Sequence, residues 1–154
     1  MKKYMLPLLG VAILFTSCSD EYLLERKEDK IIGTWEFEKA HYKADRSLFR
    51  DNITDEYADD LIVFYGDYVA EYADASLNAV FPGEWRILLD RDIYYTNEET
   101  SGNVEFFIDA TFFDMLAGED FEFFGSIDRL DRNVLKFEAR DRDGTYTFRL
   151  CRRY

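Results

Sequence analysis

The sequence predicts an all-β protein, an eight- to nine-stranded antiparallel up-and-down barrel with a short helix or lid loop after the first strand. Three observations support this fold class. Apolar and polar residues alternate with the two-residue period of half-buried strands, turn-forming pairs separate the runs at hairpin spacing, and aromatic residues make up 18% of the chain. Closing such a meander into a barrel removes the exposed strand edges that would otherwise promote aggregation.

The first strand is expected from Lys30 to Ala40. Gly33, Trp35 and Phe37 fall on one side of a two-residue repeat, and polar residues fall on the other. This segment therefore predicts a sheet that is solvated on one face only.

The Gly33-Thr34-Trp35 segment resembles the Gly-x-Trp signature of the lipocalin-like (calycin) barrels. The resemblance implies that Gly33 lets the chain turn into the barrel floor, that Trp35 plugs this end, and that residues 30–154 form one lipocalin-like domain. It also implies a basic residue covering the tryptophan, for which Arg152 and Arg153 are both candidates. The acidic-turn motif that the family usually carries in mid-chain is absent.

Residues 41–60 break the alternation and are expected to form the loop over the open end of the barrel. Thr54, followed by Asp55 and Glu56, is typical of a helix N-cap with acids in the first turn. This predicts a short helix within the loop.

A series of short strands follows, separated by turn signals. The turns are expected at Gly66-Asp67, Pro82-Gly83, Ser101-Gly102, residues 131–133 and Asp143-Gly144. The strands are expected at residues 61–65, 68–72, 85–90, 93–96, 103–110, 121–128, 134–140 and 145–151. Residues 112–117 fit either one helical turn or a continued strand.

Residues 1–17 are typical of a signal peptide. Lys2 and Lys3 precede an apolar run that is shorter than the roughly 20 residues of a spanning helix. The Ser17-Cys18 end resembles the bacterial lipobox, which implies that Cys18 becomes the lipidated first residue, carrying acyl chains such as palmitate. The alternative is an ordinary secretory peptide that leaves Cys18 as a plain thiol.

Residues 18–29 are then the lipidated cysteine and a tether. Ser19-Asp20-Glu21 resembles the acidic tract that some Gram-negative lipoproteins use for export to the cell surface, and the alternative is a solvated tether. The expected location is the cell envelope, lipid-anchored in the outer membrane and exposed at the surface.

The chain is acidic, with 19 basic and 32 acidic residues, and removal of residues 1–18 with their two lysines leaves 17 basic residues and a net charge of −15. Such a surface repels nucleic acid and anionic lipid headgroups, so we expect no nucleic-acid partner. The two cysteines are Cys18 and Cys151, and lipidation of the first excludes an internal disulfide.

Catalytic and metal-binding patterns are weak. His41 is the only histidine, no serine has a nucleophile-elbow setting, and no glycine loop could cradle a phosphate. Asp141 and Asp143 fit a hairpin turn better than a calcium loop, and the acids of residues 55–60 fit a solvated face better than a catalytic pair. We therefore expect a non-enzymatic protein without metal or cofactor.

The aromatic residues that the alternation places inside the barrel are compatible with two functional hypotheses. In the first, a cup lined by Tyr68, Tyr72, Trp85 and Phe106 binds a small hydrophobic molecule. In the second, side chains fill the barrel, and the lipoprotein contacts another envelope component. An enclosed apolar cavity of at least about 300 Å³ would distinguish the two. The residues expected to face inward are Trp35, Phe37, Tyr68, Tyr72, Trp85, Ile87, Phe106, Ile108, Phe121, Phe123, Phe137, Phe148 and Leu150.

Overall fold

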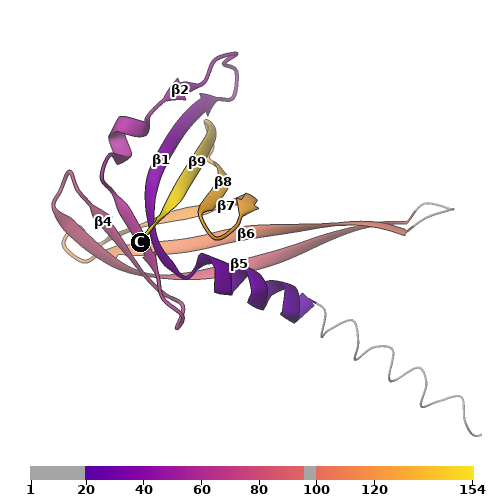
Figure 1. Ribbon diagram of the computed structural model, residues 1–154. Coiled ribbons are helices and arrows are strands. Elements are labelled where there is room, and N and C mark those ends of the chain that lie inside the picture. Colours follow the sequence, from indigo (N-terminus) through magenta and orange to yellow (C-terminus); the bar gives the residue numbers. More distant parts are fainter. Residues whose placement is uncertain (1–19, 96–99) are drawn as a thin grey trace, which may run out of the picture.

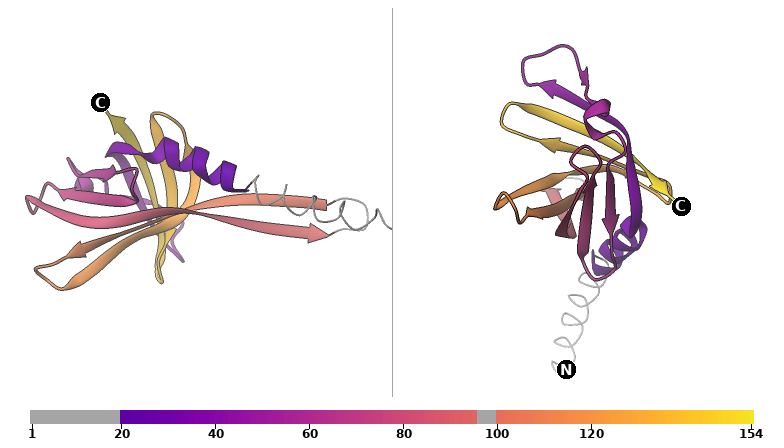
Figure 2. Two further views of the ribbon diagram at one scale, coloured as in Figure 1. Left: turned by 90° about the horizontal axis from the view of Figure 1, so that it is seen from below. Right: turned by 90° about the vertical axis from the view of Figure 1, so that its left-hand side faces the viewer.

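The structure, a computed structural model, describes residues 20–95 and 100–154. Within them the chain forms a closed barrel of eight antiparallel strands with one extra strand beside it, as Figures 1 and 2 show. The predicted fold class is confirmed. The strands are β1 (Gly33–Ala44), β2 (Asp51–Asn52), β3 (Leu61–Phe64), β4 (Val69–Asp74), β5 (Ala79–Tyr95), β6 (Thr100–Asp114), β7 (Glu119–Leu130), β8 (Val134–Arg140) and β9 (Gly144–Arg153).

The first strand closes the barrel. β1 pairs with β3 along one edge and with β9 along the other, and the strands between them follow one another in sequence order. At this seam Trp35 lies between Ile62 on β3 and Arg152 on β9. We call this end of the barrel the base and the opposite end, where β1 leads into β2, the mouth.

The segment expected to be a tether is helical from residue 20 to residue 31 and leads away from the base (Figure 1). The first strand begins at Gly33, so the expectation that it begins at Lys30 is wrong. Ile31 is fully buried, and its carbonyl oxygen accepts a hydrogen bond of 2.6 Å from Trp35 Nε1. An apolar residue at position 31 is compatible with the end of a packed helix as well as with a strand. The alternation of apolar and polar residues alone therefore does not show where the helix ends and β1 begins. Among the described residues, we find no helix with the length and apolar character needed to span a membrane.

The short helix after the first strand is confirmed as a 3-10 helix, η1 (Thr54–Tyr57). Thr54 is its first residue and not its N-cap, a position held by Ile53. The Thr54 hydroxyl is engaged elsewhere, because it accepts from the Ala40 N–H at 3.0 Å and donates to Asn52 Oδ1 at 2.6 Å. These bonds fasten the helix to β1.

Two expected turns are wrong, because Pro82-Gly83 and Ser101-Gly102 lie inside β5 and β6. At Gly83 a Cβ atom would overlap the carbonyl oxygen of Thr111 on β6, so glycine serves close strand approach here and not a turn. The alternative left open at residues 112–117 is also resolved, because β6 continues to Asp114 and a turn follows. Thr96, the end of another expected strand, lies outside the described residues.

The barrel core is aromatic. The largest fully buried side chains are Trp35, Phe64, Phe112 and Phe137. Most of the residues expected inside are buried, namely Trp35, Phe37, Tyr72, Trp85, Ile87, Ile108, Phe123, Phe137, Phe148 and Leu150. Phe106 and Phe121 are partly buried against this core.

Trp35→Ala should lower the free energy of unfolding by about 3–5 kcal/mol, because it leaves a cavity at the seam of the barrel. Denaturant melts monitored by circular dichroism measure the change. Phe49→Ala is the control, since Phe49 is 79% exposed and its loss should cost less than about 0.5 kcal/mol. A loss below about 1 kcal/mol for Trp35→Ala would show that the residue does not support the base.

Candidate functional site

The base is closed by a contact between Gly33, Trp35 and Arg152. Gly33 has φ = 136°, and a Cβ atom at this position would overlap Nη1 of Arg152. Only glycine combines this backbone conformation with the space that the guanidinium needs. The positions expected to plug the barrel are therefore close together at one end of it.

Arg152, one of the two basic candidates, covers the tryptophan. Its guanidinium carbon lies 4.5 Å from the centroid of the Trp35 ring. Arg152 also donates to the carbonyl oxygens of Lys30 at 2.5 Å, Ile32 at 2.6 Å and Arg132 at 2.5 Å. One side chain thus joins the end of the helix, the entry to β1, the β7–β8 turn and β9.

Aromatic rings occupy the middle of the barrel. The rings of Phe37, Tyr72, Phe112, Phe123 and Phe148 come from five different strands, and neighbouring centroids among them lie 5.5–6.4 Å apart. These separations are those of packed aromatic pairs. The rings therefore take up the space in which an interior ligand was expected.

Tyr72, one of the four expected ligand residues, is part of this packing. Its hydroxyl donates to the buried carboxylate of Asp60, which also accepts from the Ala75 N–H at 2.8 Å. Burial, followed by the hydrogen bond to Asp60, raises the pKa of Tyr72. The polar end of Tyr72 is thus satisfied within the protein and is not free for a ligand.

Tyr68 does not face the interior, which corrects its expected position beside Tyr72. It precedes β4, has φ = 65° and is 50% exposed. The two-residue alternation of the strand therefore does not extend to Tyr68, although Ala70 and Tyr72 do share the inner face. Its hydroxyl donates to Glu28 of the helix at 3.1 Å.

Trp85 and Phe106 also lie in two different environments. Trp85 is buried, its ring centroid lies 5.4 Å from that of Tyr68, and its Nε1 donates to the Tyr65 carbonyl oxygen at 2.9 Å. Phe106 lies under the Lys27 ammonium, whose nitrogen is 4.7 Å from the ring centroid. The four expected ligand residues therefore do not meet in one cup.

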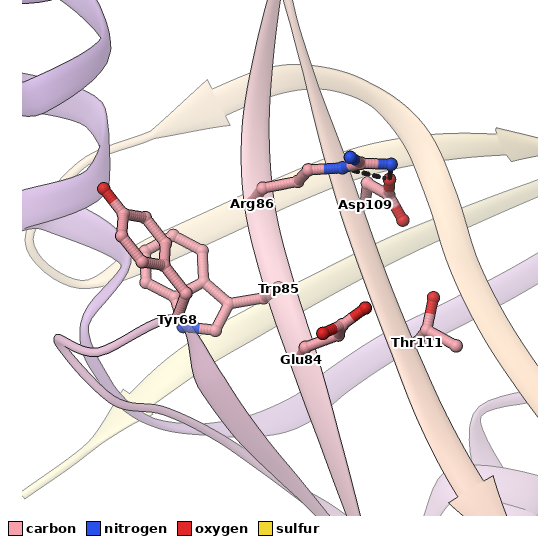
Figure 3. A pocket seen from close by; sticks show the side chains of 6 residues that line it. All are labelled: Tyr68, Glu84, Trp85, Arg86, Asp109 and Thr111. Atoms are coloured by element: carbon pink, nitrogen blue, oxygen red, sulfur yellow. Dashed lines mark hydrogen bonds and ion pairs between the residues drawn. The ribbon is translucent and has the colours of Figure 1, made fainter.

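Tyr68 and Trp85 instead line an open pocket of about 380 Å³ together with polar residues of β5 and β6, which Figure 3 shows. The other lining residues are polar, and Arg86 is ion-paired with the largely buried Asp109 at 2.6 Å. Burial and a hydrogen bond with Asp109 raise the pKa of the neighbouring Glu122. This pocket is charged, so it does not suit the apolar molecule expected from the sequence.

A groove lined by aromatic side chains and by the charged residues Glu122, Arg140 and Asp141 lies at the mouth, and we call it the mouth groove. Strand β7 pairs with β8 only from Gly125 onward, so residues 119–124 extend past the end of β8 and leave a gap beside the β8–β9 hairpin. The groove in this gap has a volume of about 420 Å³ and opens to solvent. Its aromatic lining residues are Tyr57, Phe121, Phe123, Phe124, Tyr146 and Phe148.

No protein-family model, curated protein or solved structure matches the chain.

Two features of the described residues bear on metal and thiol chemistry. No group of three or more His, Cys, Asp or Glu side chains gathers there in an arrangement that could hold a metal ion. Cys151 is partly buried, and burial together with a hydrogen bond to Glu36 raises the pKa of its thiol to about 11. At neutral pH the thiol is thus protonated and unreactive. The expected lipidation site, Cys18, lies outside the described residues.

Some residues that shape the mouth could not be identified from the sequence. Tyr146 is in the expected alternation with Phe148, which provides a usable signal. Tyr57 ends η1 and Asp60 directly precedes β3, in a segment without strand periodicity. Asp60 is buried although its neighbours suggest a solvated acidic face. Only the folded chain places Asp60 beside Tyr72.

Ala70→Leu should lower the free energy of unfolding by about 1–3 kcal/mol, because Ala70 is fully buried among large side chains and a bulkier residue overpacks the barrel. Urea melts measure the effect. Ala75→Leu is the control at an exposed position in the following turn and should change stability by less than about 0.5 kcal/mol. If Ala70→Leu leaves stability unchanged and abolishes binding of an apolar fluorescent probe, the barrel holds an open cup.

Proposed function

We propose that this protein is a non-enzymatic, lipid-anchored module of a Gram-negative envelope that contacts another envelope protein through the mouth of its barrel. The observation that carries the proposal is that exposed apolar side chains lie on three separate loops of this end. These are Leu48 and Phe49 before β2, Leu77 between β4 and β5, and Met115 and Leu116 between β6 and β7. We call these five residues the apolar tips.

The apolar tips belong to loops that alternate along the meander, so they all lie at the mouth, away from the helix at the base. Leu116 is fully exposed and Leu48 is 92% exposed. Single exposed apolar residues are ordinary, but several on the loops of one end, which also carries a groove with an aromatic lining, are typical of an interaction surface. The packed barrel interior favours a role for this surface over a role for an internal ligand.

The edge of β7 beside the mouth groove adds to this surface. Residues 119–124 pair with β6, and in the described part of the chain no strand pairs with their other edge. Such an edge presents backbone N–H and C=O groups to which an extended segment of a partner can add as a strand. Aromatic side chains in the groove would then hold the apolar residues of that segment.

A second candidate function is the binding of a small hydrophobic molecule in the mouth groove. Its volume of about 420 Å³ and its aromatic lining favour this alternative over a ligand inside the barrel. The lipocalin-like resemblance supports the same alternative. The two candidates differ in whether a protein or a small molecule covers the mouth.

Photo-crosslinking in cells tests the protein-partner proposal. A photoreactive residue in place of Phe49 should give one discrete adduct, whereas the same residue in place of the exposed Asp90 on β5 should not give that adduct. The Met115→Ser/Leu116→Ser double variant should remove the Phe49 adduct, because it removes part of the same surface. An adduct that persists in this variant, or forms equally from Asp90, would contradict the proposal.

The anchor is tested separately by Cys18→Ala. This variant should leave the membrane fraction or accumulate with its leader uncleaved, because acyl chains contribute about 0.8 kcal/mol per buried methylene and supply the membrane affinity. Fractionation after a high-salt wash measures the change. Processed Cys18→Ala protein that still sediments with membranes would contradict lipid anchoring at this residue.

A further inference from the structure

A groove at the base is basic although the chain carries a net charge of −13. It has a volume of about 500 Å³ and lies between the helix, the β7–β8 turn and the end of β9. We call it the basal groove. Its lining residues are Arg26, Asp29, Lys30, Ile32, Arg132, Arg152 and Tyr154.

The cations of the basal groove have no carboxylate at ion-pairing distance within the described residues. The ion pairs found there use other cations, namely Arg86, Arg91, Arg129, Lys136, Arg140 and Arg149. Four positive side chains thus share a groove in which Asp29 is the acidic side chain. Arg26 lies over the Tyr22 ring at 5.6 Å, and Arg152 donates to backbone carbonyls, so neither charge is neutralised by a carboxylate. An acidic protein has carboxylates available for pairing, so this concentration of cations without a carboxylate partner points to an external anion.

The helix separates its charges by face. Arg26 and Lys30 are four residues apart and therefore share one face, which borders the basal groove. Glu21, Glu25 and Glu28 lie on another face, beside Tyr68. This arrangement keeps most of the helix carboxylates away from the groove.

Arg152 gives the groove a fixed cation. Its three hydrogen bonds to backbone carbonyls and its position over Trp35 hold the guanidinium in place. A guanidinium has five N–H donors, so donors remain for a further acceptor. Planar guanidinium groups bind phosphate well, and a guanidinium that is already held loses little freedom on binding.

We propose that the basal groove binds the phosphate of an anionic lipid headgroup. The choice of a lipid over a soluble phosphate rests on the proposed anchoring of the chain at Cys18, two positions before the first described residue. At 1.5 Å per residue, the helix from residue 20 to residue 31 spans about 17 Å, so an anchored chain keeps the groove near the headgroup layer. The groove would then orient the barrel, with its base toward the membrane and its mouth away from it.

Vesicle flotation tests the proposal with the chain from Ser19 onward, which carries the helix and every described strand but no acyl chain. This chain should float with vesicles of phosphatidylcholine containing phosphatidylglycerol at low ionic strength, and not with phosphatidylcholine alone. The Arg26→Gln/Lys30→Gln/Arg132→Gln variant should bind about 100-fold more weakly, because each basic residue near an anionic surface contributes about 1 kcal/mol. Arg152 is left unchanged because it supports the fold.

The matched control is Lys43→Gln/Arg46→Gln/Arg50→Gln, which removes the same charge from exposed residues near the mouth. It should bind anionic vesicles like the unchanged chain, and circular dichroism should show that both variants fold. Equal loss in both variants, or equal binding to the two vesicle types, would overturn the proposal. Protection of the unchanged chain against thermal unfolding by inorganic phosphate, without flotation, would overturn the lipid assignment in favour of a soluble phosphate.

Because the flotation chain has no lipid, its result does not depend on acylation of Cys18. Crosslinking from Phe49 reports on the opposite end of the barrel. The mouth proposal can therefore fail while the basal proposal stands, and the reverse also holds.

Discussion

The guanidinium of Arg152 lies over Trp35 and donates to three backbone carbonyls, and the base of the barrel depends on this contact. The contact requires Gly33, because any side chain there would occupy the position of the guanidinium. It also requires the helix to end at Ile31, where the Lys30 carbonyl is free to accept from Arg152. A charged side chain is stable in this position because its hydrogen bonds replace those lost to water. At the base, Arg152 thus connects the helix, the first strand and the last strand, in addition to the pairing of β1 with β9.

The aromatic interior has a functional consequence. A barrel of eight strands is just wide enough to be filled by side chains, and the bulky rings here meet across it. Rigid packing of this kind makes the barrel a support that holds its loops and its helix at opposite ends. The two ends differ in chemistry, since the mouth exposes apolar side chains and the base gathers cations. The proposed protein contact uses the mouth, and the proposed headgroup site uses the base. The barrel interior then has a structural role only.

The fold could be predicted from the sequence to a large extent, because strand alternation and hairpin turns are local signals. Val134 to Arg140 is a strand with the expected bounds, and Trp35 and Phe37 face inward as the alternation indicates. Turn predictions failed where glycine has another role than forming a turn. Gly83, for example, allows two strands to approach closely and does not form a turn. The candidate sites were less predictable. The mouth groove exists because β8 ends before β7 does. The basal groove brings together residues that are more than 100 positions apart in the chain. Neither arrangement produces a periodic pattern in the sequence from which it could be predicted.

The pairing of β1 with β9 has a consequence for the time course of folding. Lys30 and Arg152, which meet at the base, are separated by 122 positions. Contacts between such distant residues form late in folding, because closing the long loop between them costs chain entropy before the contacts add any stability. Until β9 is in place, the open edges of β1 and β8 remain available to other chains. A chain that is still being synthesised therefore stays vulnerable to misassembly until nearly all of it has emerged.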